Sequence, residues 1–537
     1  MSDKLVDVLV VGAGPVGLFC ANELTRHGLH ARIIEKKTEL SDKSKALGIH
    51  IRTLDVLEDC GFFDTFLQEG HQVRGALLKS KGKQLADLTF ENIGGSRDYL
   101  IDLPQDKSER VFYQGLVNKQ IPVEWQSELL RIEQQPDEVL ATVKRSDGIE
   151  EKIRTKWIIA CDGAHSTLRH LVNAEFIGSA YAQTWWLADL HIHWALPENK
   201  MIINTSEQGP LACFPMGNKR YRVVMTAPSE KTSQPTMDDI IEAFNKRSSD
   251  KAALSLPVWI TAFSIHHRQI QQYRHERVFF SGDAAHVHSP MGGQGLNTGI
   301  QDVYNLVWKL ALVQKGLAKD QLLNSYHEER YPIGKAVLKK TDLMTKMILI
   351  KNPYVIAARN RIITFLSSIN FLRKTLARDL AELNISYAKS SIVTATGEKT
   401  GFKAGEFVPD IAFKNLATGS TKSLKTISQG TCHHLFLFVG KQNSDSRALS
   451  EIAITVANKY TQVLVVHLVL LEPAQKSVDF ASLWIDENHV LAQHASLNHS
   501  AALLVRPDKY IGLVQSPVRL ENLQSSLEER FFISKQP

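Results

Sequence analysis

Four short, mainly apolar runs mark the first 300 residues of the chain, and each is followed within two residues by glycine or an acidic residue. The runs are VDVLVV (6–11), ARII (31–34), KWIIA (156–160) and RVFF (277–280). Near-continuous apolar runs of this length are typical of strands buried on both faces of a parallel sheet. Between the first two runs, a helical pattern continues to Gly28, a residue suited to end a helix. The pattern predicts a strand–helix–strand unit at the N-terminus and later strands of the same sheet.

Two further patterns follow. Between Phe176 and His266 apolar and polar residues alternate along several short segments, which predicts antiparallel strands. After about Lys389 comes a polar, glycine-containing linker, then the apolar segment HHLFLF, a helical pattern near ALSEIAITVANKY, the segment QVLVVHLVLL and a final hairpin. This order predicts a separate α/β domain, and 537 residues are in any case too many for one compact core.

Composition and charge add little to the predicted fold, but they exclude some kinds of partner and site. The net charge of +6 is mild for the length and gives no reason to expect a nucleic-acid partner. The five cysteines form no CxxC pair and no metal-ligand spacing, so we expect a reduced, cytoplasmic protein without a metal site. The N-terminus does not resemble a signal peptide, and the longest apolar run is far shorter than a membrane span. We therefore expect no integral membrane segment.

One stretch has a strong local bias. Between Leu343 and Arg378 every charged residue is basic, and apolar residues are interleaved among them. Such a stretch can form a helix that lies on a membrane surface. It can also form a helical hairpin with one packed and one solvated face, which is the commoner arrangement and our preferred interpretation. The basic residues are Lys346, Lys351, Arg359, Arg361, Arg373, Lys374 and Arg378.

A glycine motif follows the first predicted strand. Gly12, Gly14 and Gly17 have GxGxxG spacing, which suits a tight turn, a close approach of backbone to a pyrophosphate, and close helix–strand packing. The helix N-terminus would face the phosphates, and Glu35 at the end of the second strand could accept hydrogen bonds from ribose hydroxyls. Because all these parts are present, the motif predicts a dinucleotide site, although it does not say which dinucleotide. No second GxGxxG exists, so a second dinucleotide would bind without its own motif.

Two more predicted strands end in acidic turns, Asp162-Gly163 and Gly282-Asp283. An aspartate before a helix can be a simple cap, but these stand where open α/β sheets bind ligands. Together with the glycine motif, in this order, the turns resemble the group A flavoprotein monooxygenases, the aromatic hydroxylases related to para-hydroxybenzoate hydroxylase. The block GDAAHVHSPMGGQGLNTGIQDVYNLVWKLA is similar to the family pattern throughout.

The resemblance implies an FAD site. Asp283 would bind the ribityl or ribose part, and Pro290 would lie beside the flavin ring. The backbone of the Gly-Gly-Gln-Gly run would offer N–H groups to the ring, and the helix that begins there would stabilise negative charge on a reduced flavin. The expected cofactor-binding residues are Gly12, Gly14, Pro15, Val16, Gly17, Glu35, Lys36, Lys45, Gln114, Asp162, Arg169, Gly282, Asp283, Pro290, Gly292, Gly293, Gln294, Gly295, Leu296 and Asn297.

Some of these positions concern the electron donor or depart from the family pattern. Asp162 and Arg169 match an Asp-Gly motif that the family links to both FAD and NAD(P)H. Lys45 stands where the family usually has arginine. Lysine has the same charge as arginine but lacks its planar guanidinium group. Lys36 and its neighbour Lys37 could attract a 2′-phosphate, which would favour NADPH slightly over NADH, or they could form a solvated charge run. Gln114 matches a glutamine that contacts the cofactor.

The resemblance also implies the architecture. We expect an α/β fold with a discontinuous Rossmann-like FAD-binding domain of the glutathione reductase type, residues 1–175 and 266–390. An antiparallel β-sheet substrate domain, residues 176–265, is inserted between its parts. Residues 395–537 resemble the thioredoxin-like domain appended to many of these hydroxylases. Because this domain lacks CxxC, packing or subunit contact, with a possible homodimer, is more plausible than dithiol exchange.

The substrate region is less informative. Trp185, Trp186, Phe214, Pro215 and Met216 are candidates for an apolar wall over the flavin, although each could equally be part of the core. A general base that deprotonates a phenol could come from His191, His193, His266 or His267. Adjacent strand residues point to opposite faces, and the sequence does not choose among them. The catalytic residue therefore stays unassigned.

The expected function is that of an FAD-dependent monooxygenase. It would use NAD(P)H and O2 to hydroxylate a phenolic, polyketide-like or antibiotic-like aromatic compound through a flavin C4a-hydroperoxide. A flavin halogenase on the same fold is disfavoured, because its Trp-x-Trp-x-Ile-Pro element is absent. Two alternatives stay open: a quinone oxidoreductase that inserts no oxygen, and a non-catalytic protein that binds flavin or an aromatic drug.

Overall fold

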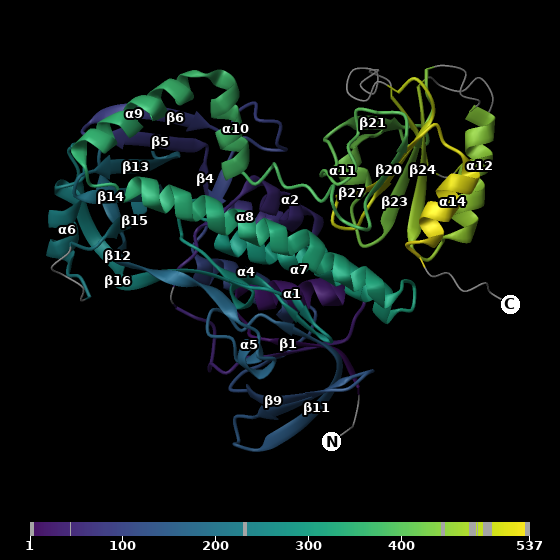
Figure 1. The fold of residues 1–537 in the computed structure, drawn as a ribbon, viewed down its shortest axis with the longest axis horizontal. Coiled ribbons are helices and arrows are strands. Elements are labelled where there is room, and N and C mark those ends of the chain that lie inside the picture. Colours follow the sequence, from purple (N-terminus) through teal and green to yellow (C-terminus); the bar gives the residue numbers. More distant parts are fainter. Residues whose placement is uncertain are drawn as a thin grey trace. The chain divides into compact units, whose positions relative to one another are not determined.

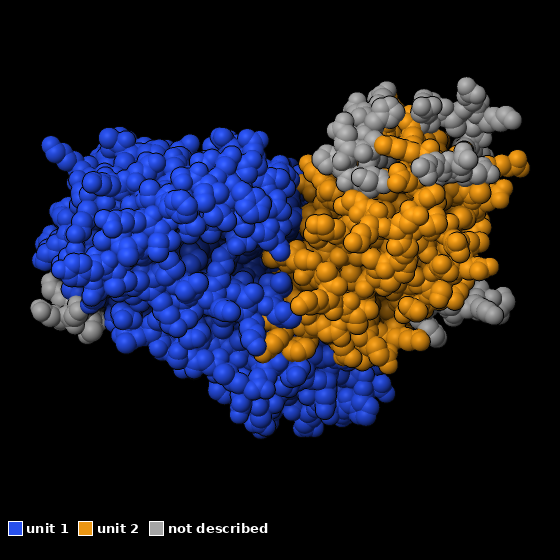
Figure 2. Space-filling model, turned by 45° about the horizontal axis from the view of Figure 1, so that its top comes forward, with its two compact units in different colours: residues 1–23, 30–303, 332–384 blue, residues 24–29, 304–331, 385–537 orange. Residues whose placement is uncertain are grey.

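The computed structural model describes residues 5–42, 44–228, 234–441, 446–471, 480, 482–486 and 497–531 (Figure 1). The chain forms two compact units, which Figure 2 shows in different colours. Unit 1 comprises residues 1–23, 30–303 and 332–384, and unit 2 comprises residues 24–29, 304–331 and 385–537. Among the described helices, none is long and apolar enough to cross a lipid bilayer.

The first sheet of unit 1 is built on the parallel strands that the apolar runs predict. Its main order is β17-β18-β11-β1-β2-β8, with β9 and β10 extending from β11. The pairs β18–β11, β11–β1, β1–β2 and β2–β8 are all parallel, so their carboxyl ends lie at one edge of the sheet. The strands are β1 (Val6–Val11), β2 (Ala31–Ile34), β8 (Val123–Glu124), β9 (Glu128–Gln134), β10 (Val139–Lys144), β11 (Glu150–Ala160), β17 (Arg274–His275) and β18 (Val278–Phe280).

The second sheet of unit 1 is almost entirely antiparallel, as the alternating pattern predicts. Its order is β19-β16-β12-β15-β14-β13-β5-β6. Two of its strands, β5 and β6, come from residues 75–89, outside the segment predicted to form the substrate domain. The strands are β5 (Gly75–Ser80), β6 (Lys83–Thr89), β12 (Phe176–His193), β13 (Lys200–Ser206), β14 (Gly209–Pro215), β15 (Arg220–Thr226), β16 (Ala253–Ile270) and β19 (His286–Val287).

Helices cover these sheets, and several have sequence-encoded starts. Asn352 caps α9, where its side chain accepts hydrogen bonds from Tyr354 N and Val355 N, and Pro353 is the first helical residue. Figure 1 shows α9 and α10 lying over β5 and β6. The helices are α1 (Pro15–Arg26), α2 (Ile51–Asp59), α3 (Phe63–Glu69), α4 (Gln105–Asn118), α5 (Thr167–Leu171), α6 (Met237–Asn245), α7 (Gly295–Gln314), α8 (Asn324–Ile348), α9 (Pro353–Ser368) and α10 (Asn370–Leu380).

Short elements complete unit 1. A three-stranded sheet has the order β3-β7-β4. Its strands are β3 (Gly48–Ile49), β4 (His71–Val73) and β7 (Leu100–Asp102), and one turn of 3-10 helix, η1 (Gly282–Ala284), follows β18. A second such turn, η2 (Asp320–Leu323), belongs to unit 2.

Unit 2 contains an eight-stranded mixed sheet of order β20-β27-β26-β23-β24-β25-β21-β22. Its central strand β23 pairs in parallel with β24 and antiparallel with β26, and apolar clusters cover both faces. Its thioredoxin-like character stays a prediction. The elements are β20 (Thr394–Gly397), β21 (Ala412–Asn415), β22 (Thr421–Ser423), α11 (Leu424–Ile427), β23 (His433–Phe438), α12 (Ser446–Lys459), β24 (Leu464–Leu470), β25 (Leu483–Ile485), β26 (Ala501–Val505), β27 (Ile511–Ser516) and α14 (Leu520–Glu528).

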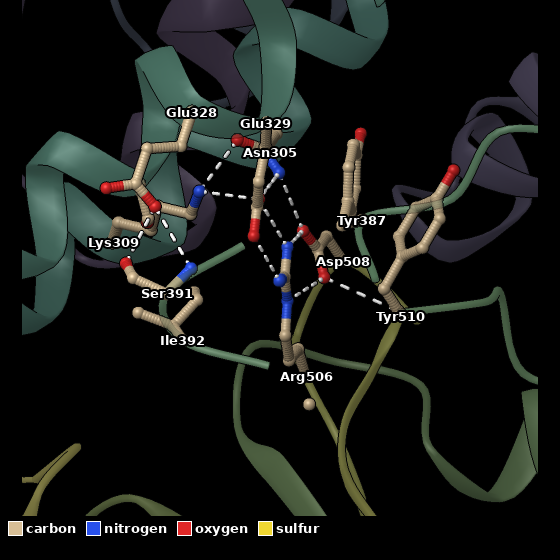
Figure 3. A network of polar contacts seen from close by, with 12 residues as sticks. Asn305, Lys309, Glu328, Glu329, Tyr387, Ser391, Ile392, Arg506, Asp508 and Tyr510 are labelled. Carbon is tan, nitrogen blue, oxygen red and sulfur yellow. Dashed lines mark hydrogen bonds and ion pairs between the residues drawn. The ribbon is translucent and has the colours of Figure 1, made fainter. Parts of the chain in front are cut away.

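A buried ion network in unit 2 holds the second half of α7. Arg506, just after β26, donates to Glu329 Oε1 at 2.6 Å and Oε2 at 2.9 Å, and to Asp508 Oδ1 at 2.9 Å (Figure 3). Lys309 of α7 lies 2.8 Å from Glu329 Oε2. Burial alone would raise the pKa of Glu329, but Arg506 and Lys309 outweigh it and hold that pKa well below its usual range. Since α7 begins at Gly295 in unit 1, this network fixes the later part of a helix that both units share.

Candidate active site

The glycine turn after β1 has the geometry that its three glycines predict. Gly12 has φ of +102°, and a Cβ there would lie 2.5 Å from the Cys161 carbonyl oxygen. A Cβ on Gly17 would lie 1.9 Å from the Gly12 carbonyl oxygen, so helix α1 and the turn touch backbone to backbone. At Gly14, by contrast, a Cβ would meet nothing within 4 Å. Gly14 thus borders open space at the N-terminus of α1, where an anion is favoured.

The start of α1 also brings two of the motifs together. Pro15 is the first helical residue, and the side chain of Val16 packs against Gly282 and Gly299. A Cβ on Gly282 would lie 3.1 Å from Val16 Cγ2, and one on Gly299 would lie 2.6 Å from the same atom. The glycine turn and the Gly-Asp turn, which are about 270 residues apart in sequence, are therefore neighbours at one edge of the parallel sheet.

Glu35 is fixed at the same edge. Its Oε2 accepts a hydrogen bond from Ala13 N at 2.8 Å, and its Oε1 accepts one from Lys37 N at 3.0 Å. The residue is 9% exposed, so it lies just below the surface beside the glycine turn. Each oxygen keeps a lone pair for a further donor, such as a ribose hydroxyl. Lys36 and Lys37 are exposed beside it.

The Ser44–Ala46 loop is held by a buried arginine of the second sheet. Arg222 of β15 donates to Lys45 O and Ala46 O, both at 3.0 Å, and to Ser44 Oγ at 2.9 Å. Its other N–H groups form a bidentate pair with Asp189 of β12 at 2.8 and 2.9 Å. Both charged side chains are 2% exposed. Lys45 itself is exposed, while its backbone is anchored to the sheet.

Helix α4 supplies a different glutamine from the one predicted. Gln114 is exposed and donates to Asn118 Oδ1 on its own helix, so the structure does not bring it to the site. Gln105, which the sequence pattern did not indicate, accepts from Ala46 N at 3.0 Å and donates through its backbone to Ser44 Oγ at 2.8 Å. The two glutamines lie roughly 13 Å apart along the helix. Gln114 therefore stays a prediction, whereas Gln105 is the glutamine of this helix that the structure joins to the Ser44–Ala46 loop.

The Asp-Gly turn after β11 leads into α5 through two caps. Ser166 Oγ accepts from Arg169 N at 3.0 Å, and Asp162 Oδ2 accepts from Leu168 N at 3.1 Å. Burial raises the pKa of the Asp162 carboxyl, while the Ser166 hydroxyl lowers it. The helix cap that the sequence allowed for Asp162 is therefore present, and it lies at the same edge of the sheet as the glycine turn.

Arg169 is 4% exposed and acts as a brace in this structure. It donates to Ala164 O at 2.7 Å and to Ala284 O at 3.4 Å, and its guanidinium lies 4.0 Å above the Phe176 ring. These contacts join the Asp-Gly turn to the Gly-Asp turn. Arg169 therefore holds the two turns together, and a direct contact with the cofactor stays a prediction.

Asp302, another residue that the sequence motifs did not indicate, holds the Gly-Asp turn in place. Its Oδ2 accepts from Gly282 N at 3.1 Å and lies 2.7 Å from His286 Nε2. Asp302 is fully buried on α7. Asp283, in contrast, is an exposed residue of η1, so it can meet a ligand at the sheet edge.

The Gly-rich loop before α7 is locked by an asparagine and a histidine. Gly292 and Gly293 have φ of +88° and +64°, which glycine adopts without strain. Asn297 Nδ2 donates to Gly293 O and Gly48 O, both at 2.8 Å, and its Oδ1 accepts from His50 N at 2.8 Å. His50 Nε2 lies 2.8 Å from Gly292 O, and burial lowers the pKa of His50 to about 4.

The loop therefore presents a rigid start of α7. The helix begins at Gly295, and Thr298 N donates to Gln294 O at 2.9 Å to close its first turn. Gln294 Oε1 is buried with no hydrogen-bond partner among the described residues. Pro290 is exposed beside this helix start, and Leu296 is buried behind it. Backbone N–H groups at a helix N-terminus stabilise a negative charge that lies close to them.

A buried acid lies beside the same loops. Asp102 of β7 is 1% exposed, and neither carboxyl oxygen has a hydrogen-bond partner among the described residues. A Cβ on Gly48 would lie 3.3 Å from Asp102 Oδ1. Burial raises the pKa of Asp102 to about 8, and the nearby positive charge of Arg222 opposes that rise only in part. Asp102 is therefore mostly a neutral acid near pH 7.

One face of the second sheet lies toward these loops. Because alternate residues of a strand point to opposite faces, only some of its aromatic residues lie on that face. Trp185 of β12 is buried in a cluster with Met291 of the Gly-rich loop, and Phe214 of β14 packs against that cluster. Trp186 lies on the opposite face, in a core that includes α6. Pro215 pairs with a residue of that same opposite core. Trp186 and Pro215 thus lie on the face opposite Trp185, because neighbouring strand residues point to opposite faces, and their role as wall residues stays a prediction.

The remaining cluster defines an apolar face with one polar group at its edge. Trp185, Leu187, Val224, Ile265 and Met291 form the buried part. Tyr181 packs against it and donates to Asp342 Oδ1 of α8 at 2.6 Å. Met216 is half-buried in the turn after β14. In the described part of the chain, no group of three or more His, Cys, Asp or Glu side chains could hold a metal ion.

Together, the glycine turn, Glu35, the Gly-Asp turn and the Gly-rich loop form one cradle within unit 1. It has open space at Gly14, two helix N-termini and an acid at the end of β2, which fit the phosphates, the ribose and the ring of a flavin dinucleotide. The unpartnered Gln294 Oε1 at the start of α7 is a further polar group that a ligand could satisfy.

Comparison with known proteins agrees with this cradle. Residues 5–341 match the family described as "FAD binding domain". The chain is 31% identical over 400 residues to the 6-methylpretetramide 4-monooxygenase of Streptomyces rimosus, covering 73% of this chain and 72% of that protein. It is 33% identical over 350 residues to the rifampicin monooxygenase of Streptomyces venezuelae, covering 64% and 72%.

A solved structure extends the likeness over nearly the whole chain. The anhydrotetracycline hydroxylase OxyS from Streptomyces rimosus superimposes with a TM-score of 0.76 at 26% identity, covering 98% of this chain and 99% of that one. The α/β fold with an FAD-binding domain, expected from the motifs, is confirmed by this match and by the parallel sheet. The chain therefore belongs to the FAD-binding-domain family, and the relatives named above are monooxygenases and hydroxylases of aromatic compounds.

Proposed function

We propose that this FAD-dependent aromatic monooxygenase hydroxylates a multi-ring phenolic compound of the polyketide or antibiotic type. The observation that carries the proposal is the apolar face formed by Trp185, Leu187, Val224, Ile265 and Met291, which adjoins the Gly-rich loop. A large aromatic ligand needs such a surface, with few polar groups to fix its orientation. The relatives named for pretetramide, rifampicin and anhydrotetracycline compounds support a multi-ring substrate.

The cofactor supplies hydride acceptance and oxygen activation when bound, and the protein supplies the environment. We propose that the backbone around Gly14 and the N-terminus of α1 bind the pyrophosphate. Glu35 and Asp283 would then accept hydrogen bonds from ribose and ribityl hydroxyls. The start of α7, from Gly292 to Asn297, would face the pyrimidine edge of the ring and stabilise negative charge there. Trp185 and Met291 would exclude water from the reacting ring.

The Ser44–Ala46 loop would also help to position the flavin. We propose that Arg222 and Asp189 act as positioning residues, since they hold the backbone of Lys45 and Ala46 from the substrate sheet. Gln105 replaces Gln114 in this proposal. The preference for NADPH over NADH stays a prediction from Lys36 and Lys37. A cytoplasmic location and a homodimer stay predictions.

The experiment follows NADPH and NADH oxidation by the FAD-loaded protein against a panel of multi-ring phenols, simple phenols and quinones. The proposal predicts that a multi-ring phenol accelerates NADPH oxidation at least severalfold and that O2 is consumed with it. Acceleration by quinones without O2 consumption would favour a quinone oxidoreductase instead. If no ligand of the panel changes the rate, the proposed substrate class is wrong.

A further inference from the structure

Exposed apolar side chains are concentrated in one part of unit 1. Of the 18 large apolar side chains that are exposed among the described residues, 10 lie between Leu343 and Leu376. Scattered apolar residues are normal on a protein surface, whereas exposed apolar residues gathered on adjoining helices are typical of an interaction site. The α9–α10 surface consists of Leu343, Met347, Tyr354, Val355, Ile362, Phe365, Leu366, Ile369, Phe371 and Leu376.

Helix α9 turns its apolar side outward. Its inner face is fixed on β6 by buried Ile356 and by Ser367, whose Oγ donates to Leu85 O at 3.1 Å. The outer face carries Val355, Ile362 and Leu366 at spacings of seven and four residues, which places them on one side of a helix. Aromatic residues stand out furthest: Tyr354 is 85% exposed, Phe365 66% and Phe371 76%. The sequence predicts one packed and one solvated face, and the structure shows that the solvated face is apolar too.

The charged residues within this segment of the chain have one sign. No acidic residue occurs between Leu343 and Arg378. Lys351, Arg361 and Lys374 are exposed there. Other basic groups are engaged: Lys346 lies 2.7 Å from Asp342 Oδ2, Arg359 donates to Met347 O at 2.8 Å, and Arg378 donates to Ile93 O. Lys351, Arg361 and Lys374 therefore accompany the apolar side chains as accessible cations.

We propose that the α9–α10 surface docks on an anionic lipid bilayer. Exposed aromatic and aliphatic residues combined with lysine and arginine are the composition of helices that lie in the membrane interface. A second copy of this chain is a poorer occupant, because a two-fold contact would place like charges of this surface against each other. With 16 residues, α9 is about 24 Å long, which suits lying in the interface rather than crossing it.

The surface also adjoins the candidate substrate site. The inner side of α10 contributes Ala377 and Leu380 to the cluster against which Phe214 packs, and Phe214 borders the apolar face near Trp185. A docked protein would hold this part of the substrate sheet beside the membrane, where multi-ring aromatic compounds accumulate. This last step rests on the proposed function, whereas the docking itself does not.

The test is co-sedimentation of the FAD-loaded protein with vesicles of phosphatidylcholine alone or phosphatidylcholine mixed with phosphatidylglycerol. We expect binding only to the anionic vesicles, weakened by salt. Neutralising Lys351, Arg361 and Lys374 to Gln should weaken binding by roughly fivefold per charge, or ~100-fold in total. Replacing Phe365 and Phe371 with Ser should abolish it.

A matched control replaces Ile149 and Val258, which are 63% and 58% exposed elsewhere, with Ser and should bind like the wild type. All variants should retain FAD and the wild-type rate of NADPH oxidation, so failure of docking is distinguishable from failure of the proposed function. The proposal is overturned if the wild type ignores anionic vesicles, or if the Phe365→Ser/Phe371→Ser variant still binds them. It is also overturned if sedimentation equilibrium shows a dimer that this variant dissociates, because a second copy would then cover the surface.

Discussion

Two glycines of the same motif should respond in opposite ways to the same substitution. At Gly17, a Cβ would lie 1.9 Å from the Gly12 carbonyl oxygen, a backbone atom that cannot move without opening the turn. Overpacking of this kind costs typically ~1–3 kcal/mol, and a clash between two backbones belongs at or above the upper end. We expect Gly17→Ala to lower the midpoint of thermal unfolding by roughly 4 °C.

At Gly14, a Cβ would meet nothing within 4 Å, and the residue has no positive φ. Gly14→Ala should therefore leave the apoprotein as stable as wild type, or more stable by ~0.4–1 kcal/mol through a less flexible unfolded chain. The added methyl group would occupy the space in which we place the pyrophosphate. Loss of one charge-assisted hydrogen bond there, about 1.5–3 kcal/mol, would weaken FAD binding by roughly 10- to 100-fold.

The two quantities are measured separately. Thermal unfolding of the apoprotein is followed by circular dichroism, and FAD affinity is measured by titration of flavin fluorescence. Two results would each refute this reasoning: Gly14→Ala destabilises the apoprotein as much as Gly17→Ala, or Gly14→Ala binds FAD with wild-type affinity. The first result would mean that the space at Gly14 is structural, and the second that the pyrophosphate lies elsewhere.

Three further predictions concern charge. Arg222→Lys keeps the positive charge but removes the guanidinium N–H groups that hold the Ser44–Ala46 loop, so FAD affinity measured by the same titration should fall by ~10-fold or more. An unchanged affinity would exclude this positioning role of Arg222. The pKa of Asp102 is raised from 3.8 to about 8, so between these pH values the folded protein binds one more proton than the unfolded chain, and its stability falls as pH rises. Asp102→Asn should therefore raise the midpoint of thermal unfolding at pH 8 but not at pH 4. Equal midpoints of variant and wild type at pH 8 would contradict the burial argument. Burial lowers the pKa values of His50 and His288 from 6.5 to about 4, so the unfolded chain binds more protons in this range and stability should fall as pH drops from 6.5 toward 4. In a pH series of thermal unfolding, His50→Asn should make this fall less steep. An unchanged slope would contradict the prediction for His50.

The parts of the site that could be predicted are those encoded by a few consecutive residues. Gly12 to Gly17 specify a turn and a helix start through local geometry alone, and Glu35 follows the next strand of the same unit. The Asp-Gly and Gly-Asp turns each follow a recognisable apolar strand. Because the four strands are parallel and adjacent, these turns had to meet at one sheet edge once the strands were assigned.

The parts that were missed depend on register or on long-range pairing. Trp185 and Trp186 cannot be told apart without knowing which face of β12 is turned inward, and a one-residue slip exchanges them. Gln105 and Gln114 lie on one helix, and only the position of the Ser44–Ala46 loop selects the first. Arg222 reaches that loop across 178 residues of sequence, a contact that no local pattern encodes.

Helix α9 shows a different limit. Its apolar and basic composition predicted a helix correctly, but the sequence does not reveal which of two apolar faces packs on β6. Only the structure shows that Val355, Ile362 and Leu366 are left outside. This is why the membrane-surface interpretation, which the sequence alone disfavours, becomes a proposal once the exposed side chains are known.

The central claim is that an oxygen atom from O2 is inserted into an aromatic ring. The most direct measurement supplies oxygen-18 gas to the FAD-loaded protein with NADPH and the phenol that most accelerates NADPH oxidation, and analyses the product by mass spectrometry. We predict one oxygen-18 atom in each hydroxylated product molecule and no product without O2. A product that carries no label, or that forms equally well without O2, would contradict this claim.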